Sequence, residues 1–149
     1  METFKRILLV EDDPKDVELT LNALSEYCVA NEIAIARDGE EALDFLYRRG
    51  TFASRLEGNP VVILLDLKLP KLDGIQVLRH LKTDEQMRCI PVVVLTSSRE
   101  DRDLVECYKL GVNAYVVKPI RFTEFVEAVR QLGIFWALIN EAPPSSVKK

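Results

Sequence analysis

An uninterrupted apolar run, residues 61–65, ends directly in an aspartate, Asp66. Turn-forming residues bound the run, because Gly58-Asn59-Pro60 precede it and Asp73-Gly74 follow it. Such a run predicts a strand that is buried on both faces, as in the centre of a parallel sheet. Open parallel sheets bind ligands at the carboxyl ends of their strands, so Asp66 occupies a candidate site. Taken alone, however, Asp66 is better explained as a helix cap or a salt-bridged loop residue.

Strand and helix patterns alternate along the chain. We expect strands at residues 6–10, 33–35, 61–65, 91–95 and 114–117. Helical patterns follow each of them: after caps at Asp13 and Asp38, around Ile75, Leu78 and Leu81, over residues 100–110, and from Phe122. This alternation predicts an α/β fold, a doubly wound five-stranded parallel sheet with helices on both faces.

The composition is that of one globular domain. The chain has 149 residues, of which 48% are hydrophobic and 30% charged, and this is enough for a single core. A net charge of −4 with only small basic clusters argues against nucleic acid as a partner. No apolar run reaches membrane-spanning length, and the polar start Met1-Glu2-Thr3 lacks a signal-peptide pattern. We therefore expect a cytoplasmic protein without a membrane partner.

Cysteine and histidine are scarce. The three cysteines, Cys28, Cys89 and Cys107, are odd in number and widely spaced, which favours reduced thiols over disulfides or a zinc site. His80 is the single histidine. The sequence therefore argues against a histidine-based metal site and against Ser-His or Cys-His catalysis.

Polar residues stand at the ends of four expected strands. Glu11-Asp12-Asp13 follow the first strand, Asp66 the third, Thr96 the fourth and Lys118 the fifth. In a parallel sheet these ends share one edge, so carboxylates, a hydroxyl and an ammonium converge on one crevice. Clustered carboxylates favour a hard divalent cation such as Mg²⁺, and lysine and threonine suit a phosphoryl group. An aspartate beside such a metal is a candidate nucleophile toward phosphorus.

Each of these residues also has a simpler explanation. Thr96 alone is better read as the cap of the following helix, and Lys118 alone as a solvated surface charge. Tyr115, in the fifth expected strand, is equally well explained as an ordinary aromatic residue at the sheet edge as by a functional role. The joint arrangement is what favours a functional site.

Together, Glu11-Asp12, Asp66, Thr96, Tyr115 and Lys118-Pro119 resemble the receiver domain of two-component response regulators, which has the chemotaxis-regulator fold. Thr96 lies 30 positions after Asp66, and Lys118 lies 22 positions after Thr96, as in that family. The resemblance covers residues 4–139. Residues 140–149 include Pro143-Pro144-Ser145-Ser146, a composition that predicts a flexible C-terminal tail. It implies a flavodoxin-like sheet with the strand order 2-1-3-4-5.

The resemblance also implies the phosphoacceptor and the metal ligands. Asp66 would accept the phosphoryl group and become 4-aspartylphosphate. Asp12 and Asp66 would bind Mg²⁺ directly, the main-chain carbonyl of Lys68 would complete the protein ligands, and Glu11 would act through a metal-bound water. Asp13 could instead take the metal-binding role of either Glu11 or Asp12, but it is better explained as the cap of the first helix.

The remaining residues would respond to phosphate. By the same resemblance, Thr96 would bond a phosphoryl oxygen, Lys118 would pair with the phosphoryl group, and Tyr115 would turn inward on activation. The domain would take its phosphoryl group from a histidine kinase and signal by changing its partner contacts.

Two features resemble the stand-alone regulators that are partnered with phytochromes. One is an additional loop at residues 49–60, and the other is the Asp-Leu-x-Leu-Pro form of residues 66–70. A phytochrome is therefore the expected kinase. Lys68 fills the middle position, where that subfamily often has Asn, and this leaves the lifetime of the phosphate open.

The end of the last helix is apolar nearly all round. One helix face can bury only part of this surface against its own sheet. Exposed aromatic patches mark interfaces, so we expect a homodimer that uses Phe135, Trp136 and Ile139. The alternative is a helix end that is covered by the tail.

Three other functions fit the sequence less well. A haloacid dehalogenase-like phosphatase also uses an aspartate nucleophile, but it needs a second aspartate where this chain has Lys68. We therefore expect no turnover of an external substrate, that is, no enzyme. Nucleotide-binding domains carry G-x-G-x-x-G or G-x-x-x-x-G-K-S/T, and neither motif occurs. A phosphorylation-independent scaffold would not need the complete set of site residues.

Overall fold

A computed structural model of the chain describes residues 7–24, 33–55, 58–96, 101–112, 114–118 and 121–132. The strands are β1 Ile7–Val10, β2 Ile33–Ala36, β3 Val62–Asp66, β4 Val92–Thr96 and β5 Ala114–Val117. The helices are α1 Pro14–Leu24, α2 Gly39–Tyr47, the short 3-10 helix η3 Gly50–Phe52, α3 Gly74–Thr83, α4 Asp101–Lys109 and α5 Phe122–Leu132. The expected elements are present, but Asp66 and Thr96 are the last residues of their strands rather than the first residues after them.

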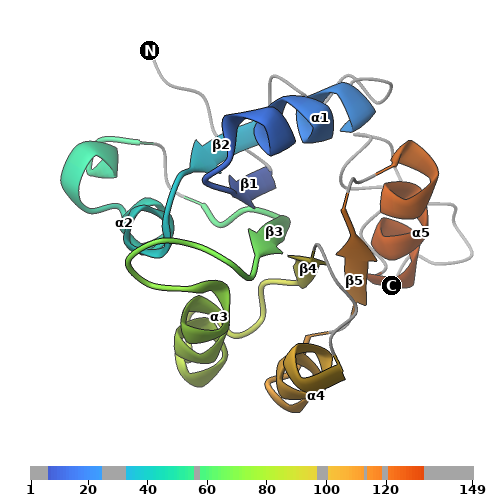
Figure 1. The fold of residues 1–149 in the computed structure, drawn as a ribbon. Helices are drawn as coiled ribbons and strands as arrows, with labels where there is room; N and C mark the ends of the chain where they lie inside the picture. The colour runs from blue at the N-terminus through green and yellow to red at the C-terminus, as the bar shows by residue number, and fades with distance from the viewer. Residues whose placement is uncertain are drawn as a thin grey trace, which may run out of the picture.

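The sheet is parallel throughout and has the order β2-β1-β3-β4-β5, which confirms the doubly wound prediction. Figure 1 shows α1 and α5 on one side of the sheet and α2, α3 and α4 on the other. In the register, Val10 pairs with Leu65, and Asp66 pairs with Leu95. The carboxyl ends of β1, β3 and β4 therefore meet at one edge.

Each face of the sheet carries its own hydrophobic core. Ile63 and Leu65 pack with residues of α2 and α3, whereas Val62 and Leu64 pack with residues of α1 and α5. Every residue of β3 is buried. This double coverage is why residues 62–65 of the central strand are all apolar.

Side-chain caps start the helices next to the site. Pro14 opens α1, and the Asp13 carboxylate accepts a hydrogen bond of 2.9 Å from the backbone N–H of Lys15. This confirms Asp13 as a cap. Asp73 starts α3 through a reciprocal capping box with Gln76.

Gly74, the first residue of α3, lies against the backbone at the end of β3. A Cβ atom at this position would come within 2.3 Å of the Asp66 carbonyl oxygen and 2.5 Å of the Leu67 Cα. No side chain fits in this space. The close approach fixes the start of α3 beside Asp66.

A buried arginine anchors the additional loop between α2 and β3. Arg55 donates hydrogen bonds to the carbonyl oxygens of Phe45 at 2.7 Å and Gly58 at 3.0 Å. Its guanidinium also lies over the Phe45 ring, 4.1 Å from the centroid. These contacts tie the loop to the end of α2.

Several sequence predictions concern other parts of the chain. Across the described ranges, no helix is long and apolar enough to cross a membrane. Of the cysteines in these ranges, neither Cys89 nor Cys107 is in a disulfide. Cys28, Pro119 and residues 133–149, which include Phe135, Trp136 and Ile139, lie outside the described residues. The tail and the dimer interface therefore stay predictions.

Candidate functional site

Three carboxylates meet at the carboxyl edge of the sheet. Glu11 and Asp12 follow β1, and Asp66 ends β3, which pairs with β1. One carboxylate oxygen from each residue lies within 4.8 Å of the others. Glu11 and Asp66 are buried, whereas Asp12 is exposed. This acidic triad offers oxygen ligands at one point, the chemistry that Mg²⁺ prefers.

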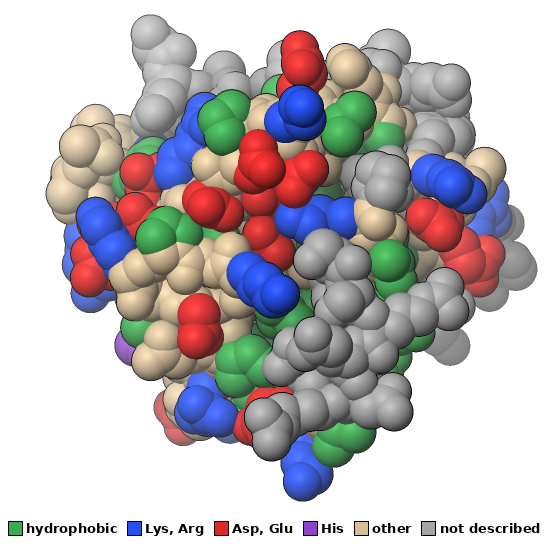
Figure 2. All heavy atoms as spheres, viewed as in Figure 1, with side chains coloured by type: hydrophobic (Ala, Val, Ile, Leu, Met, Phe, Trp, Pro, Cys, Tyr) green, Lys and Arg blue, Asp and Glu red, His purple; other side chains and the backbone are tan. Residues whose placement is uncertain are grey.

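Lys118 reaches into the triad from the end of β5. Its Nζ lies 3.0 Å from Glu11 Oε1 and 3.3 Å from Asp66 Oδ2. The lysine side chain is only 12% exposed, so these are shielded ion pairs. In Figure 2, acidic side chains gather next to a basic group at this edge, below α1. The structure thus unites Glu11, Asp12, Asp66 and Lys118 as predicted.

A fourth carboxylate at this edge was missed by the sequence reasoning. Asp16, in the first turn of α1, places its Oδ2 2.9 Å from Lys118 Nζ. The one signal in the sequence was its position on the helix that follows Glu11, Asp12 and Asp13.

Burial and charge shift the pKa values of Glu11 and Lys118. Burial raises the pKa of Glu11 to about 7; the hydrogen bond from Lys118 opposes this rise and the charge of Asp66 adds to it. Burial alone would lower the pKa of Lys118, but hydrogen bonds to Asp16 and Glu11, with the charge of Asp66, raise it above its usual value. Lys118 is therefore charged. It is one basic group among four carboxyl groups, those of Glu11, Asp12, Asp16 and Asp66, and a further cation would balance this cluster better.

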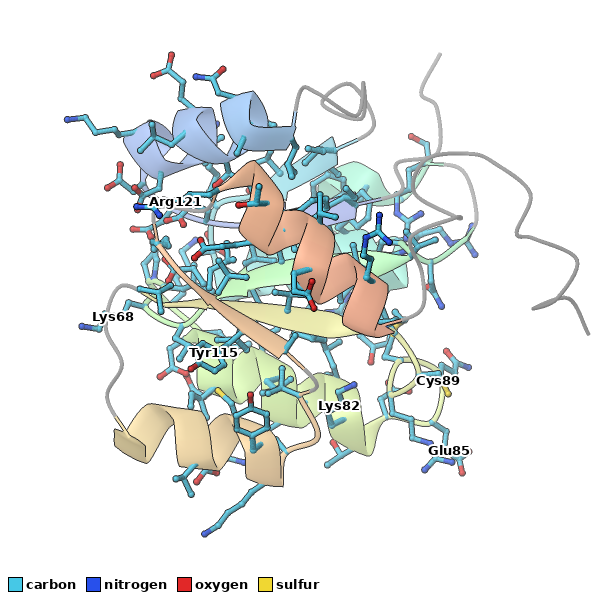
Figure 3. All side chains as sticks on the ribbon, turned by 90° about the vertical axis from the view of Figure 1, so that its right-hand side faces the viewer. Lys68, Lys82, Glu85, Cys89, Tyr115 and Arg121 are labelled. Carbon is cyan, nitrogen blue, oxygen red and sulfur yellow. The ribbon has the colours of Figure 1, made fainter. Side chains whose placement is uncertain are left out.

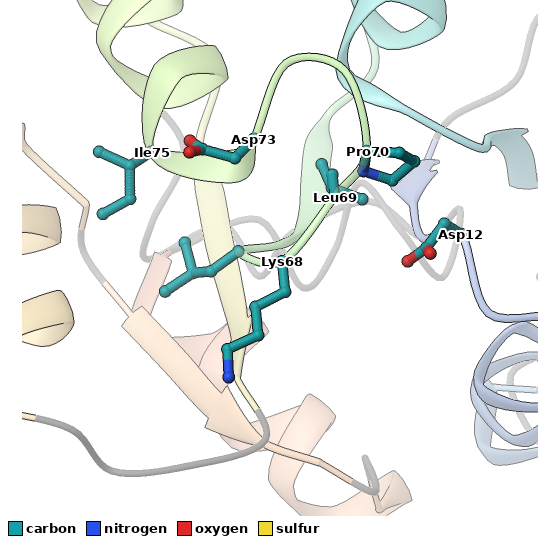
Figure 4. Close-up of a pocket in the computed structure, with 7 residues that line it drawn as sticks. Asp12, Lys68, Leu69, Pro70, Asp73 and Ile75 are labelled. Atoms are coloured by element: carbon teal, nitrogen blue, oxygen red, sulfur yellow. The ribbon is translucent and has the colours of Figure 1, made fainter.

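Lys68 lines a hollow beside the triad. Its backbone N–H donates to Asp66 Oδ1 at 3.3 Å. The hollow measures about 470 Å³ and is lined by Asp12, Leu67, Lys68, Leu69, Pro70, Asp73 and Ile75. In Figure 4, the side chain of Lys68 points away from Asp12. An open, polar hollow next to Asp12 gives a ligand access to the triad.

Thr96 and Tyr115 flank the site in different ways. Thr96 ends β4 opposite Val117, at the same sheet edge, but its side chain lies outside the described part of the structure. Tyr115 is half-buried, and its ring meets that of Tyr108 on α4 edge to face, with centroids 6.3 Å apart. Figure 3 shows Tyr115 between the sheet and α4. The switch roles of both residues stay predictions.

Residues 7–130 match the family described as response regulator receiver domain. Among curated relatives, the probable methanogenesis regulatory protein FilR2 of Methanothrix harundinacea is 39% identical over 137 residues, which are 92% of this chain and 86% of FilR2. Response regulator Rcp1 of Synechocystis is 39% identical over 132 residues, which are 89% of this chain and 88% of Rcp1.

Solved structures show the same similarity. The bacteriophytochrome response regulator RtBRR is 58% identical with a TM-score of 0.82, covering 97% of this chain and 87% of RtBRR. The phosphorylated cyanobacterial phytochrome response regulator RcpA is 38% identical with a TM-score of 0.73, covering 91% and 95%. The Mn(2+)-bound form of Rcp1 is 37% identical with a TM-score of 0.70, covering 94% and 99%.

Proposed function

We propose, since this chain belongs to the response regulator receiver-domain family, that it accepts a phosphoryl group from a histidine kinase on Asp66. The observation that carries this proposal is the contact between Lys118 Nζ and Asp66 Oδ2, 3.3 Å long, inside a cluster of carboxylates. A nucleophilic carboxylate and a shielded cation are thereby set side by side. When Asp66 carries a phosphoryl group, the Lys118 ammonium already lies next to it and stabilises the negative charge of its oxygens.

The transfer itself needs little from the protein beyond positioning and charge. An Asp66 carboxylate oxygen forms a bond to phosphorus, and the bond from phosphorus to the histidine nitrogen of the donor breaks. The electron pair of the broken bond stays on the imidazole, and Asp66 gives up no proton. Lys118 compensates the charge of the phosphoryl oxygens, and Thr96 donates its hydroxyl to one of them.

The acidic triad fits a divalent cation. In this proposal Asp12 and Asp66 would hold Mg²⁺ directly, the Lys68 main-chain carbonyl would be a third protein ligand, and Glu11 would act through a water. When bound, the ion supplies positive charge to the phosphoryl oxygens. The converging carboxylate oxygens support the assignment, as does the Mn(2+)-bound form of the relative Rcp1.

Receiver domains are signalling domains, and we infer that this one turns over no external substrate. Its output is a changed set of protein contacts, with Tyr115 turning inward as Thr96 engages the phosphoryl group. Proteins, rather than nucleic acid or membrane, are the proposed partners in the cytoplasm. We further propose a domain over residues 4–139, a flexible tail at 140–149, and a homodimer through Phe135, Trp136 and Ile139.

A phytochrome is the kinase that we propose. The relatives RtBRR and RcpA are phytochrome response regulators by name, and they match nearly the whole chain. A purified phytochrome kinase should transfer phosphate to this protein faster than an unrelated histidine kinase does. Equal rates from both kinases would contradict the phytochrome assignment.

The first prediction tests the phosphoacceptor directly. Incubation with acetyl phosphate and Mg²⁺ should add one acid-labile phosphate, which mass spectrometry of peptides should locate on Asp66. Asp66→Asn keeps the shape of the side chain but removes the nucleophile, so phosphate incorporation should be lost. Asp44→Asn is the matched control, because Asp44 is a surface residue of α2 that pairs with Arg49. Undiminished labelling of Asp66→Asn would refute the assignment.

A further inference from the structure

We infer that Asp16 is a positioning residue for phosphoryl transfer, because it holds the Lys118 ammonium over Asp66 from outside the acidic triad. The inference rests on the proposed function of the same site. It extends that function to helix α1, which the sequence motifs leave out of the chemistry.

The geometry of the ammonium is the starting point. A lysine ammonium has three N–H donors. Lys118 Nζ has a separate carboxylate acceptor for each: Asp16 Oδ2 at 2.9 Å, Glu11 Oε1 at 3.0 Å and Asp66 Oδ2 at 3.3 Å. The contact with Asp16 is the shortest of the three. Lys118 is therefore held from three sides.

The three acceptors have different fates during transfer. When Asp66 forms its bond to phosphorus, the negative charge moves outward onto the phosphoryl oxygens. Glu11 belongs to the triad that can hold a metal ion, so a bound cation would compete with Lys118 for its carboxylate. Asp16 does not belong to the triad. Of these three carboxylates, it alone can keep the same contact with Lys118 before and after transfer.

The setting of Asp16 suits this role. It lies in the first turn of α1, which packs against α5, and its side chain is 28% exposed. The lysine side chain is long and loses rotamer freedom when it is held in one position. The carboxylate of Asp16 is short and is carried by a helix, so it can hold the ammonium in one place. While Asp16 keeps one N–H donor of Lys118 in place, the donor now on Asp66 is free to turn to a phosphoryl oxygen.

The test compares Asp16→Asn with Glu18→Gln, an exposed acid of the same helix that provides a matched loss of charge. Rates of phosphate incorporation from acetyl phosphate with Mg²⁺ are measured by mass spectrometry. We expect Asp16→Asn to slow incorporation about tenfold, the order of effect of one hydrogen bond to a charged group. Glu18→Gln should react like the wild type.

A double-mutant cycle shows whether Asp16 acts through Lys118. In a Lys118→Met background, Asp16→Asn should have no further effect on the rate. Independently, the NMR signal of the Lys118 ammonium, recorded without metal or phosphate donor, should broaden in Asp16→Asn and not in Glu18→Gln. This signal reports on the hydrogen bond between Lys118 and Asp16 and not on the stability of the fold.

A wild-type rate in Asp16→Asn, or equal slowing with and without Lys118, would overturn the inference, as would an unchanged ammonium signal. If the wild-type protein itself accepts no phosphate on Asp66, the proposed function fails, and with it the transfer role of Asp16. The ammonium signal then still decides whether Asp16 positions Lys118, so the two failures are distinguishable.

Discussion

Glu11 and Asp12 are neighbours in the sequence but meet opposite environments. The side chain of Glu11 is fully buried beside Lys118 and Asp66, whereas that of Asp12 is exposed in the hollow that Lys68 also lines. Successive side chains at a strand end point in opposite directions, which explains the difference. Asp12 is thus the accessible carboxylate, and Glu11 is the one whose charge depends on its surroundings.

The buried Glu11 predicts a pH dependence of stability. Its pKa is raised from 4.5 to about 7 in the folded protein, so the native state keeps a proton that the unfolded chain loses. The contribution of Glu11 is then fully present below pH 4.5, falls as pH rises toward 7, and is level above that. The total loss is about 3 kcal/mol at the usual value per pKa unit.

Urea unfolding of the metal-free protein between pH 4 and 8 should reveal this loss, with Glu11→Gln as the control. The variant has no titrating group at this position, so the stability of the wild type relative to Glu11→Gln should decline across this range. Added Mg²⁺ should reduce the decline because the cation favours the ionised carboxylate. A stability difference that is constant with pH would contradict the prediction.

At the scale of elements, α1 combines a structural cap with a site contact. Asp13 caps its first turn, and Asp16, one turn later, reaches Lys118 at the end of β5. Asp12, just before the helix, belongs to the acidic triad. Adjacent aspartates therefore serve separate purposes, which substitution can tell apart.

We expect Asp13→Ala to lower the free energy of unfolding by about 1 kcal/mol, because the hydrogen bond to the Lys15 N–H is lost. Its Mg²⁺ affinity should change little. Asp12→Ala should weaken Mg²⁺ binding strongly and leave the helix cap in place. Thermal unfolding and a Mg²⁺ titration of both variants check this pair. A titration in which Asp13 controls the affinity would reverse the assignment of the two aspartates.

At the scale of the molecule, the phosphoryl site is connected through Tyr115 to the exposed face of α4. The phosphoryl site spans the ends of β1, β3 and β5, and Tyr115 of β5 contacts Tyr108 of α4. Tyr108 and Val105 on α4 are each 51% exposed. A movement of Tyr115 would therefore change a surface that a partner can contact.

The proposed homodimer is a second property of the whole molecule. Trp136→Glu puts a charge between Phe135 and Ile139 in the apolar segment that we propose as the interface, so it should give a folded monomer that still accepts phosphate on Asp66. Light scattering at micromolar concentration, with and without phosphorylation, measures the oligomeric state. Tyr108→Glu, on α4, is the comparison variant and should remain dimeric. A monomeric wild type in both phosphorylation states would rule out the dimer.

Much of this molecule follows from local sequence patterns. The alternation of strands and helices, the burial of β3 and the cap at Asp13 were predicted, because each depends on residues near one another in the chain. The meeting of Glu11, Asp12, Asp66 and Lys118 was also predicted, since parallel strands end at one sheet edge. Strand ends shifted slightly, because pairing with neighbouring strands decides where a strand stops.

What the sequence could not determine was decided by packing between distant elements. Asp16 and Lys118 are 102 positions apart, and their contact depends on how α1 is rotated above the end of β5. Nothing in the periodicity of α1 distinguishes Asp16 from the exposed Glu18. Likewise, the complete burial of Glu11 beside an exposed Asp12 arises once Lys118 and the surrounding helices close over one side of the strand end. Local patterns specify which residues can reach the sheet edge, whereas the tertiary packing selects those that touch and sets their charge.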